Sequence, residues 1–566
     1  MSNLAREVEI FPLPAIEPPY RPSSRSKRLW KRYQQSCVVS QVVNQCVMSL
    51  NRLSSSSFGQ VGNLLSSCSY VSSCQSRVLA HIYQCAARFV GRRATISSSE
   101  QLAESDLSVL LSDITSSYVN GDSASFSYST SFSYAALHQS AIPLVADKVS
   151  LPSSVGSVDL LDLLPQDFRS RYGSPGSILR PPSEVKKVRR SVLCGSHDEY
   201  VKLIRRMASL GMVEFTTTPK VVNGVFGVPK DGDAIRLIID ARPANSVFSD
   251  PSPVQLPTPD LLAQLVAPRD KPFYVAKVDL DNFYHRIRLP TWMRPYFALP
   301  SVHACDVDLI GDHQVYPMCT TLPMGWSHSV LVAQVAHEHF INTHTNLKSK
   351  DRIETTSHDF RLDRMRHQVY IDDLVLLGPD RQVLEIAQRQ YIDAASAHGL
   401  VVKMSKVVWP SADGIECLGL VVNGTTHEVG LSIVKLRALC DETRLVLLHG
   451  QCSGIDLSRL VGRWTWSCLV NRPSLAVLNA VYRYIETADH RVFNLWSTVR
   501  MELVTLIGLA PLLFAKLDSE WFPKLIATDA SQIGQGVVVT PMTSENMSSM
   551  SKLDDEVRAT SVQQPS

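Results

Sequence analysis

His-Gln-Val-Tyr-Ile-Asp-Asp-Leu-Val-Leu-Leu-Gly, at residues 367–378, is the stretch of sequence that decides the fold. Two adjacent aspartates, Asp372 and Asp373, lie between two apolar runs. This pattern predicts two β-strands joined by a tight turn that carries both carboxylates. Carboxylates at the tip of a hairpin can bind a hard divalent cation when other oxygen ligands converge on the same point. An isolated Asp-Asp pair is more often a solvated turn, so the prediction depends on residues elsewhere.

A partner for this hairpin lies upstream, in Tyr-Val-Ala-Lys-Val-Asp-Leu-Asp-Asn-Phe-Tyr-His-Arg-Ile at residues 274–287. An apolar, strand-like run ends there at Asp279. The two segments are far apart in the sequence, so only the fold can bring their carboxylates together. Acidic strands that meet around a pair of metal ions are the arrangement that nucleotidyl transfer requires.

Several further motifs accompany these two, and their order resembles that of a reverse transcriptase. Residues 370–373 match the Tyr-x-Asp-Asp box, and residues 279–287 are similar to the first catalytic motif as retrotransposons write it. The resemblance extends over residues 195–530, and a fixed order of motifs is far more specific than any one of them. The other matching segments are Val225–Gly232, Arg236–Asn245, Leu322–Ser329, Lys403–Lys406 and Cys417–Leu420.

The resemblance implies an α+β fold arranged as a right hand, with fingers, a palm built on an antiparallel sheet, and a thumb. A serine-rich, partly helical N-terminal region precedes it. We expect residues 1–180 to form this partly disordered region and residues 181–430 the fingers and palm. Residues 431–515 are expected to form thumb- and connection-like helices, and residues 516–566 the start of a ribonuclease H-like domain with a disordered tail.

The ribonuclease H resemblance rests on Ile526–Ser531, followed by Gly534 and Gly536. It is similar to the first strand of that domain, where the residue equivalent to Asp529 is a metal ligand. The polar, serine-rich residues after it are too few to supply the remaining strands and acids. The sequence therefore predicts a truncated domain without ribonuclease H activity.

The reverse transcriptase resemblance also implies a metal site with two Mg²⁺ ions, or Mn²⁺ in their place. Asp279 and Asp372 are the expected bridging ligands, and the backbone carbonyl of Leu280 is a further ligand. Asp373 is expected to tune the site and to contact metal only weakly. In this chemistry one ion lowers the pKa of the primer 3′-hydroxyl and the other holds the leaving pyrophosphate.

Residues that contact the incoming nucleotide are implied by the same resemblance. Lys230 and Arg236 fall where the family grips the triphosphate, although a solvated basic face is the plain alternative. Tyr284 is the expected steric gate against a 2′-hydroxyl, with a core aromatic as its alternative and Phe283 assigned to the core. Lys406 is the candidate for protonating the leaving pyrophosphate, and Lys403 competes for that role.

Gly325 supplies a backbone without Cβ, which allows close approach to a nucleotide. Ser327 or Ser329 is then expected to cap a helix that runs through Gln334 and His337. His337 and His339 lack the spacing of a zinc-binding helix, so both are interpreted as ordinary helix residues.

The predicted function is RNA-directed DNA polymerase of an LTR-type or DIRS-type retrotransposon. Its partners would be an RNA or DNA template with a primer, and deoxynucleoside triphosphates. A viral RNA-dependent RNA polymerase is a rival, but its usual box is Gly-Asp-Asp and it would not place an aromatic gate at Tyr284. The other rival is a catalytically silent or domesticated copy that only binds nucleic acid.

Composition limits these hypotheses. The chain has 566 residues, 45% of them hydrophobic, and a net charge of only +3, so nucleic-acid binding must come from local basic surface. Twelve scattered cysteines without zinc spacing favour a reducing intracellular compartment, cytoplasmic or nuclear. No signal peptide or membrane span is predicted, and the sequence leaves the oligomeric state open.

Two clusters combine basic and aromatic residues. The first surrounds Trp30 and ends just before Tyr33; its basic residues are Arg25, Lys27, Arg28, Lys31 and Arg32. This cluster could bind nucleic acid, act as a nuclear import signal or simply begin a solvated basic helix. Residues 459–472 interleave Arg459, Arg463 and Arg472 with Trp464 and Trp466. They fit either a surface that tracks a template-primer backbone or core tryptophans with peripheral arginines.

Overall fold

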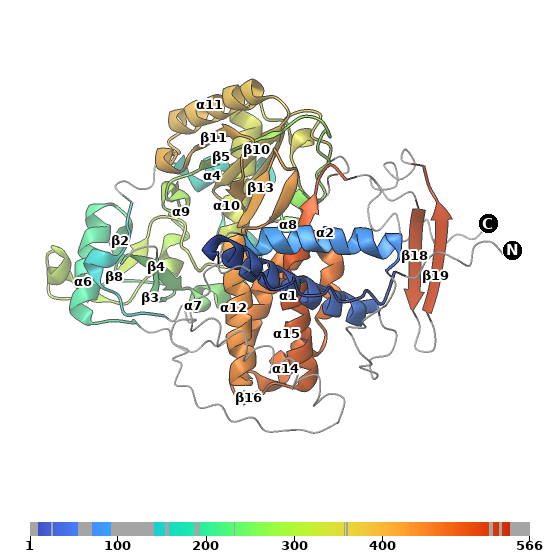
Figure 1. Cartoon of the computed structure of the whole chain (residues 1–566). Helices are drawn as coiled ribbons and strands as arrows, with labels where there is room; N and C mark the ends of the chain where they lie inside the picture. Colours follow the sequence, from blue (N-terminus) through green and yellow to red (C-terminus); the bar gives the residue numbers. More distant parts are fainter. Residues whose placement is uncertain are drawn as a thin grey trace.

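The computed structural model describes residues 10–23, 26–54, 71–91, 141–152, 158–185, 188, 193–230, 233–355, 357, 360–519, 524–530 and 535–543. The described chain mixes helices with small antiparallel sheets, which confirms the predicted α+β class (Figure 1). Much of the serine-rich region, at residues 92–140, lies outside the described residues, as does the predicted disordered tail from residue 544.

A four-stranded antiparallel sheet lies within the region expected to be the palm, with the strand order β11-β5-β10-β9. Its two middle strands are apolar because both of their faces are covered. Leu374, Leu376 and Val278 pack into one core, whereas Val375 and Val275 pack into another. Helices α10 and α11 cover the sheet. The bounds are β5 Tyr274–Asp279, β9 Arg366–Tyr370, β10 Asp373–Gly378, β11 Val408–Ser411, α10 Ser329–His344 and α11 Arg381–Ala397.

Smaller sheets form the region expected to be the fingers. Strands β3 and β4 make an antiparallel hairpin, and β2, β8 and β7 form a separate three-stranded sheet. Helix α6 begins after Ser196, whose side chain accepts a hydrogen bond from the Glu199 amide, as an N-cap does. The bounds are β1 Val158–Asp159, α4 Leu160–Leu163, α5 Gln166–Tyr172, α6 His197–Ser209, β2 Val213–Thr216, β3 Gly224–Pro229, β4 Ile235–Asp240, α7 Arg242–Val247, α8 Pro259–Ala263, α9 Phe283–Arg286, β6 Ile287–Arg288, β7 Val302–His303 and β8 Gln314–Cys319.

The chain then forms a second antiparallel sheet, β12-β13-β14-β17, and a helical bundle with its own hydrophobic core. The helices expected within residues 431–515 are present, although the helical run that begins with α13 is interrupted at Asn471, which has non-helical backbone angles. The bounds are β12 Ile415–Cys417, β13 Leu420–Asn423, β14 Glu428–Leu431, α12 Ile433–His449, β15 Gln451–Ser453, α13 Gly454–Cys468, α14 Ala480–Ala488, β16 Val492–Asn494, α15 Ser497–Leu509 and β17 Phe514–Lys516.

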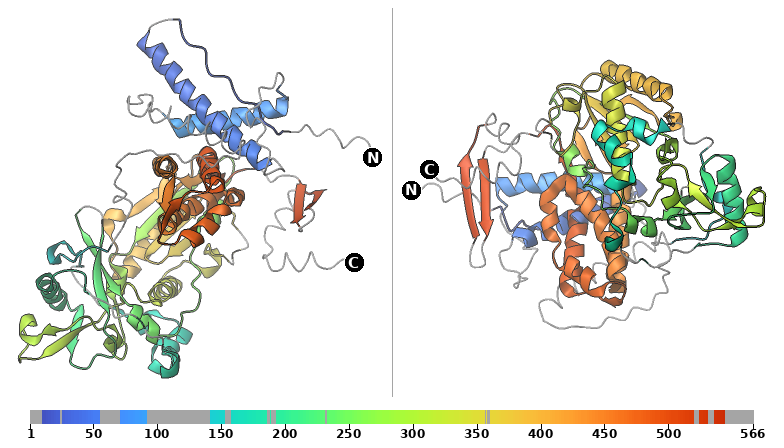
Figure 2. Two further views of the ribbon diagram at one scale, coloured as in Figure 1. Left: turned by 90° about the horizontal axis from the view of Figure 1, so that it is seen from below. Right: turned by 180° about the vertical axis from the view of Figure 1, so that it is seen from behind.

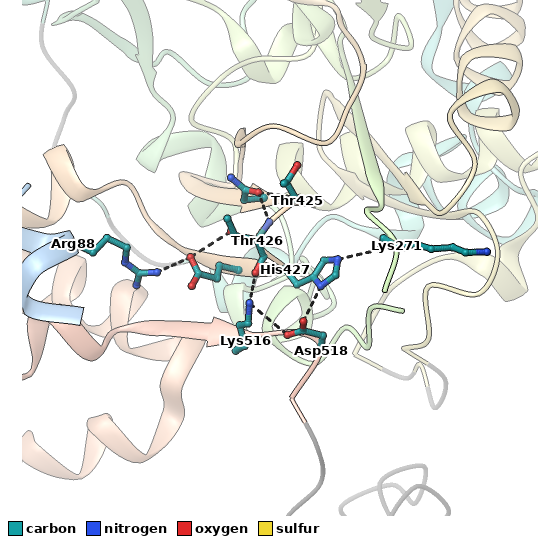
Figure 3. A network of polar contacts seen from close by, with 9 residues as sticks. Arg88, Lys271, Thr425, Thr426, His427, Lys516 and Asp518 are labelled. Carbon is teal, nitrogen blue, oxygen red and sulfur yellow. Dashed lines mark hydrogen bonds and ion pairs between the residues drawn. The ribbon is translucent and has the colours of Figure 1, made fainter. Parts of the chain in front are cut away.

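Two N-terminal helices, α1 (Lys27–Ser54) and α2 (Ser73–Val90), pack against this bundle rather than standing as a separate unit (Figures 1 and 2). The Cys46 thiol donates a hydrogen bond to the Gly508 carbonyl at 2.8 Å. Arg88 of α2 forms an ion pair with Glu428 at the start of β14, within the polar network that Figure 3 shows. The N-terminal helices therefore share one packed region with residues beyond position 425.

A hairpin of two strands, β18 (Lys524–Ala530) and β19 (Gln535–Pro541), follows the bundle. The strand predicted near Asp529 is present, while its assignment to a ribonuclease H-like domain stays a prediction. Among the described residues, no helix is long and apolar enough to cross a membrane.

Candidate active site

The antiparallel pairing of β10 with β5 brings the predicted carboxylates together. Asp373 lies directly opposite Asp279 in the register, and the Leu280 amide donates a hydrogen bond to the Asp372 carbonyl at 3.0 Å. The two segments predicted from the sequence therefore meet at their acidic ends. Asp279 is only 8% exposed, and Asp372 and Asp373 are partly buried.

Lysines balance part of this negative charge. Lys406 donates a hydrogen bond to Asp279 Oδ2 at 2.9 Å, and Lys277 lies 3.0 Å from Asp373 Oδ2. The other oxygen of Asp373, Oδ1, is buried and has no hydrogen-bond partner. In the described part of the chain, no three acidic, histidine or cysteine side chains already converge on one metal position. Lysines therefore contact one oxygen each of Asp279 and Asp373, and the buried Oδ1 of Asp373 is available to another cation.

Burial makes ionisation of this cluster costly. Desolvation raises the pKa of Asp372 to about 6, and the negative charges of Asp373 and Asp279 add to the effect. Desolvation also raises the pKa of Asp373, although Lys277 opposes it. Buried carboxylates held near one another favour any bound positive charge.

The turn between β9 and β10 is held through the backbone of Ile371. This residue has φ of +55°, in the left-handed region that β-branched residues rarely adopt. Its N–H donates to Gln334 Oε1 and its carbonyl accepts from His337 Nδ1, both at 2.7 Å. Gln334 also donates to the Val369 carbonyl at 3.0 Å. Helix α10 thus fixes both polar groups of the turn residue that precedes Asp372.

The role of His337 differs from its interpretation as an ordinary helix residue. It is fully buried, and burial lowers its pKa to about 4, so the ring is neutral near pH 7. Because a carbonyl only accepts, Nδ1 carries the proton and Nε2 accepts from the Tyr391 hydroxyl at 2.7 Å. The histidine therefore joins α11 to the acidic turn. Nothing in the local sequence indicated this, because Tyr391 and Ile371 are distant along the chain.

The Gly325 loop packs against the β3–β4 hairpin. Gly325 has φ of +125°, and a Cβ atom there would overlap the Ile239 carbonyl oxygen. Asn245 donates to the Gly325 carbonyl at 3.1 Å and accepts from the Ser327 amide at 2.9 Å. The close approach that requires glycine is thus to protein backbone, which is a different reason from the nucleotide contact expected from the sequence.

The predicted serine cap of the following helix is wrong. Helix α10 begins after His328, and its N-cap makes no side-chain hydrogen bond. Ser329 instead donates to the Pro323 carbonyl at 2.7 Å. His328 bridges the Tyr172 hydroxyl and the Ser249 carbonyl, so this helix start is fixed by tertiary contacts.

Of the predicted nucleotide-contacting residues, Lys406 contacts the carboxylate of Asp279, whereas Lys230 and Arg236 belong to the β3–β4 hairpin region. Lys230 donates to Ser150 Oγ at 3.0 Å, and burial together with the charges of Lys403, Arg236 and Lys406 lowers its pKa. Arg236 is exposed on β4. Tyr284 is half-buried near Asp372, and burial raises the pKa of its hydroxyl to about 12. Phe283 is 2% exposed, as expected of a core residue.

The second basic and aromatic cluster, at residues 459–472, is mainly structural. Trp464 is fully buried and donates to Thr443 Oγ1 at 2.9 Å, which favours the core alternative. Trp466 donates to the Leu418 carbonyl at 3.0 Å. Arg463 pairs with Glu442 and Arg459 with Asp456, so these arginines are already neutralised.

Comparison with known proteins places this site in a family. Residues 228–422 match the family model described as reverse transcriptase (RNA-dependent DNA polymerase). This part of the chain is a reverse transcriptase domain. It contains all three acidic residues, the Ile371 turn and the Gly325 loop.

Individual relatives are distant. The Gag-Pro-Pol polyprotein of Human T-cell leukemia virus 2 is 26% identical over 239 residues, which cover 41% of this chain and 14% of the polyprotein. A foamy viral protease-reverse transcriptase in complex with double-stranded DNA aligns with a TM-score of 0.43, at 13% identity, over 79% of this chain and 75% of that chain. Another structure of the foamy viral protein, also with double-stranded DNA, aligns with a TM-score of 0.44 at 13% identity, over 70% of this chain and 64% of that chain.

The raised pKa of Asp372 predicts a stability gain when its charge is removed. In metal-free buffer at pH 7, we expect Asp372→Asn to raise the free energy of unfolding by up to about 3 kcal/mol, because burial raises the pKa of Asp372 to about 6. The folded-state pKa lies above the unfolded value, so the wild-type penalty is full above pH 6 and disappears as the pH falls toward 4. Urea unfolding in the presence of EDTA, at pH 7 and at pH 4.5, measures the stability gain and its dependence on pH. A larger gain at pH 4.5 than at pH 7 would contradict the predicted sign.

The His337 contacts predict a positioning role. We expect His337→Ala to lower nucleotide incorporation at least tenfold and the free energy of unfolding by about 2–4 kcal/mol, because it leaves a cavity and two unpaired polar groups. His339→Ala is the matched control, since it removes the same side chain from the same helix and His339 is less buried. Primer extension and urea unfolding provide the measurements. Equal effects of the two substitutions would exclude a specific role for His337.

Proposed function

We propose that the chain is an RNA-directed DNA polymerase that adds deoxynucleotides to a primer on an RNA or DNA template. The observation that carries the proposal is the register of β5 with β10, which sets Asp279 against Asp373 inside the segment that matches the reverse transcriptase family. Buried carboxylates from two strands are what metal-assisted nucleotidyl transfer needs. The motif order and the retroviral relative support an origin in an LTR-type or DIRS-type retrotransposon.

The acidic cluster fits a pair of Mg²⁺ ions, or Mn²⁺ in their place. Its donors are oxygen atoms, which these hard cations prefer, and Asp373 Oδ1 is buried without a partner. Asp279 and Asp372 would be the bridging ligands, the Leu280 carbonyl a further ligand and Asp373 a weaker one. Such a pair, when bound, supplies activation of the primer hydroxyl and stabilisation of the leaving pyrophosphate.

Basic side chains beside the carboxylates would hold the triphosphate. Lys230 and Arg236 lie on or just beyond neighbouring strands of one hairpin, and their mutual repulsion contributes to the lowered pKa of Lys230. An anionic triphosphate relieves that repulsion, and the planar guanidinium of Arg236 suits phosphate oxygens. Lys406 forms an ion pair with Asp279, and its ammonium group would be the proton donor to the leaving pyrophosphate.

Tyr284 would select the sugar. It is half-buried, and the negative charge of Asp372 adds to the burial that raises the pKa of its hydroxyl, which supports a position within electrostatic reach of that carboxylate. A rigid aromatic ring at this position leaves no room for a 2′-hydroxyl. Gly325 would support the nucleotide indirectly, because its loop is fixed to Ile239 and Asn245.

The central test is magnesium-dependent incorporation of deoxynucleotides on a primed RNA template. We expect wild type to extend the primer and Asp372→Asn to reduce the rate at least a thousandfold, since one bridging ligand is lost. Asp380→Asn is the matched control: it makes the same exchange eight residues later, at an exposed helix N-cap where asparagine serves equally well. If folded wild type binds primed template but never extends it, the binding-only copy is the correct description.

The steric gate has its own test. We expect Tyr284→Ala to discriminate against ribonucleotides at least tenfold less than wild type does. The comparison is the ratio of kcat/KM for a deoxynucleotide and the matching ribonucleotide. Tyr316→Ala, which shortens a half-buried tyrosine on β8, should leave that ratio unchanged. Unaltered discrimination in Tyr284→Ala would assign this ring to the core.

A further inference from the structure

The N-terminal segment that contains α1 and α2 has basic residues without acidic ones. Residues 18–91 contain nine lysines and arginines and no aspartate or glutamate, whereas the whole chain has a net charge of only +3. The remainder of the chain therefore carries a formal excess of negative charge. The net positive charge of this segment would attract a polyanion.

The basic residues gather at the exposed beginning of α1. All buried residues of this helix lie between Val39 and Asn51, so its first three turns bury none. Lys27, Arg28, Lys31 and Arg32 are exposed, and none of them forms an ion pair with any residue that the structure describes. Their spacing sets like charges four residues apart on the same face of the helix, which is unfavourable without counter-charge. Figure 2 shows α1 extending away from the body of the protein.

Aromatic rings are interleaved with these charges. Trp30 is 37% exposed, its ring lies 5.3 Å from that of Tyr33, and the Arg21 guanidinium lies 5.2 Å above it. Tyr20 is 93% exposed just before this group. Exposed aromatic faces beside basic side chains stack unpaired bases while the charges contact the phosphate backbone.

The rest of the helical pair is firmly anchored. Arg52 donates to Thr505 Oγ1 at 2.8 Å, and a Cβ atom at Gly508 of α15 would overlap the Ser49 hydroxyl, so α1 and α15 pack in close contact. Arg88 pairs with Glu428 beside His427, Lys516 and Asp518 (Figure 3). The basic end is therefore carried on a helix fixed to the bundle that follows the reverse transcriptase domain.

We propose that the beginning of α1, from Lys27 to Tyr33, together with Tyr20 and Arg21 before the helix, binds single-stranded nucleic acid. The surface lies outside the residues that match the reverse transcriptase family, and its binding requires neither metal nor nucleotide. Its rings and charges would recognise bases and phosphates, which RNA and DNA share. A membrane surface fits less well, because the apolar face of α1 is buried against the protein at Val39, Val43 and Val47.

Fluorescence anisotropy of the full-length protein with labelled 20-nucleotide oligo(rU) and oligo(dT), in EDTA, tests the proposal. The variant Lys27→Gln/Arg28→Gln/Lys31→Gln/Arg32→Gln removes four charges. The control Lys202→Gln/Lys348→Gln/Lys350→Gln/Arg381→Gln removes four exposed charges from other elements. We expect the α1 variant to bind at least tenfold more weakly at about 0.15 M salt. The slope of log K against the logarithm of the salt concentration should become less steep by roughly 3, because each of the four lost phosphate contacts contributes about 0.7. The control should stay within about twofold of wild type.

The variant Trp30→Ala tests whether the surface prefers single-stranded to duplex nucleic acid. We expect about tenfold weaker binding of the oligonucleotides and a smaller change for a blunt duplex of equal length, because only unpaired bases can stack. Equal weakening by the α1 and control variants, or an unchanged affinity for both oligonucleotides, would overturn the proposal. The proposal would also be overturned if the α1 variant lost binding to phosphatidylserine vesicles but still bound the oligonucleotides as tightly as wild type. Matching thermal melts verify that each variant folds, and primer extension is scored separately, so failure of the polymerase assay leaves this result independent.

Discussion

The structure depends on the forced proximity of carboxylates at one edge of the central sheet. Strand pairing sets Asp373 opposite Asp279, and the Leu280 amide is bonded to the Asp372 carbonyl. The apolar residues of β5 and β10 drive this pairing, since both strands are buried on both faces. Burial of the strands thus supplies the free energy that holds like charges together, and the raised pKa of Asp372 records the electrostatic cost.

The surrounding elements stabilise that arrangement in two ways. Lys277 and Lys406 bring positive charge to the carboxylates, whereas Gln334 and His337 hold the strained Ile371 turn through its backbone. Strained backbone persists only where neighbouring groups over-determine it. The neutral state of His337, which its burial enforces, is also the state in which it can accept a hydrogen bond from Tyr391. Charge compensation and backbone positioning are therefore carried by separate residues.

Acidic and basic residues are also separated on the scale of the whole chain. Three acidic residues meet where a cation would bind, whereas the N-terminal helices hold basic residues without acidic ones. These helices pack on the bundle that follows the reverse transcriptase domain, so the fold connects a candidate strand-binding surface to the polymerase. Their anchoring contacts join residues near the beginning of the sequence to residues beyond position 425.

The sequence by itself determined the acidic hairpin and the strand that ends at Asp279, because short-range apolar patterns and turn residues specify such elements locally. The α+β class followed only from the resemblance that the motif order carries. It also indicated the family, since the order of the motifs is a property of the linear chain. Only the tertiary structure decided that Gly325 is required by the Ile239 carbonyl and that His337 tethers the turn to Tyr391. It alone showed Trp464 to be a core residue and α1 to be docked on α15. Each of these depends on contacts between residues distant in the sequence, and no local pattern encodes which distant partner a side chain will meet.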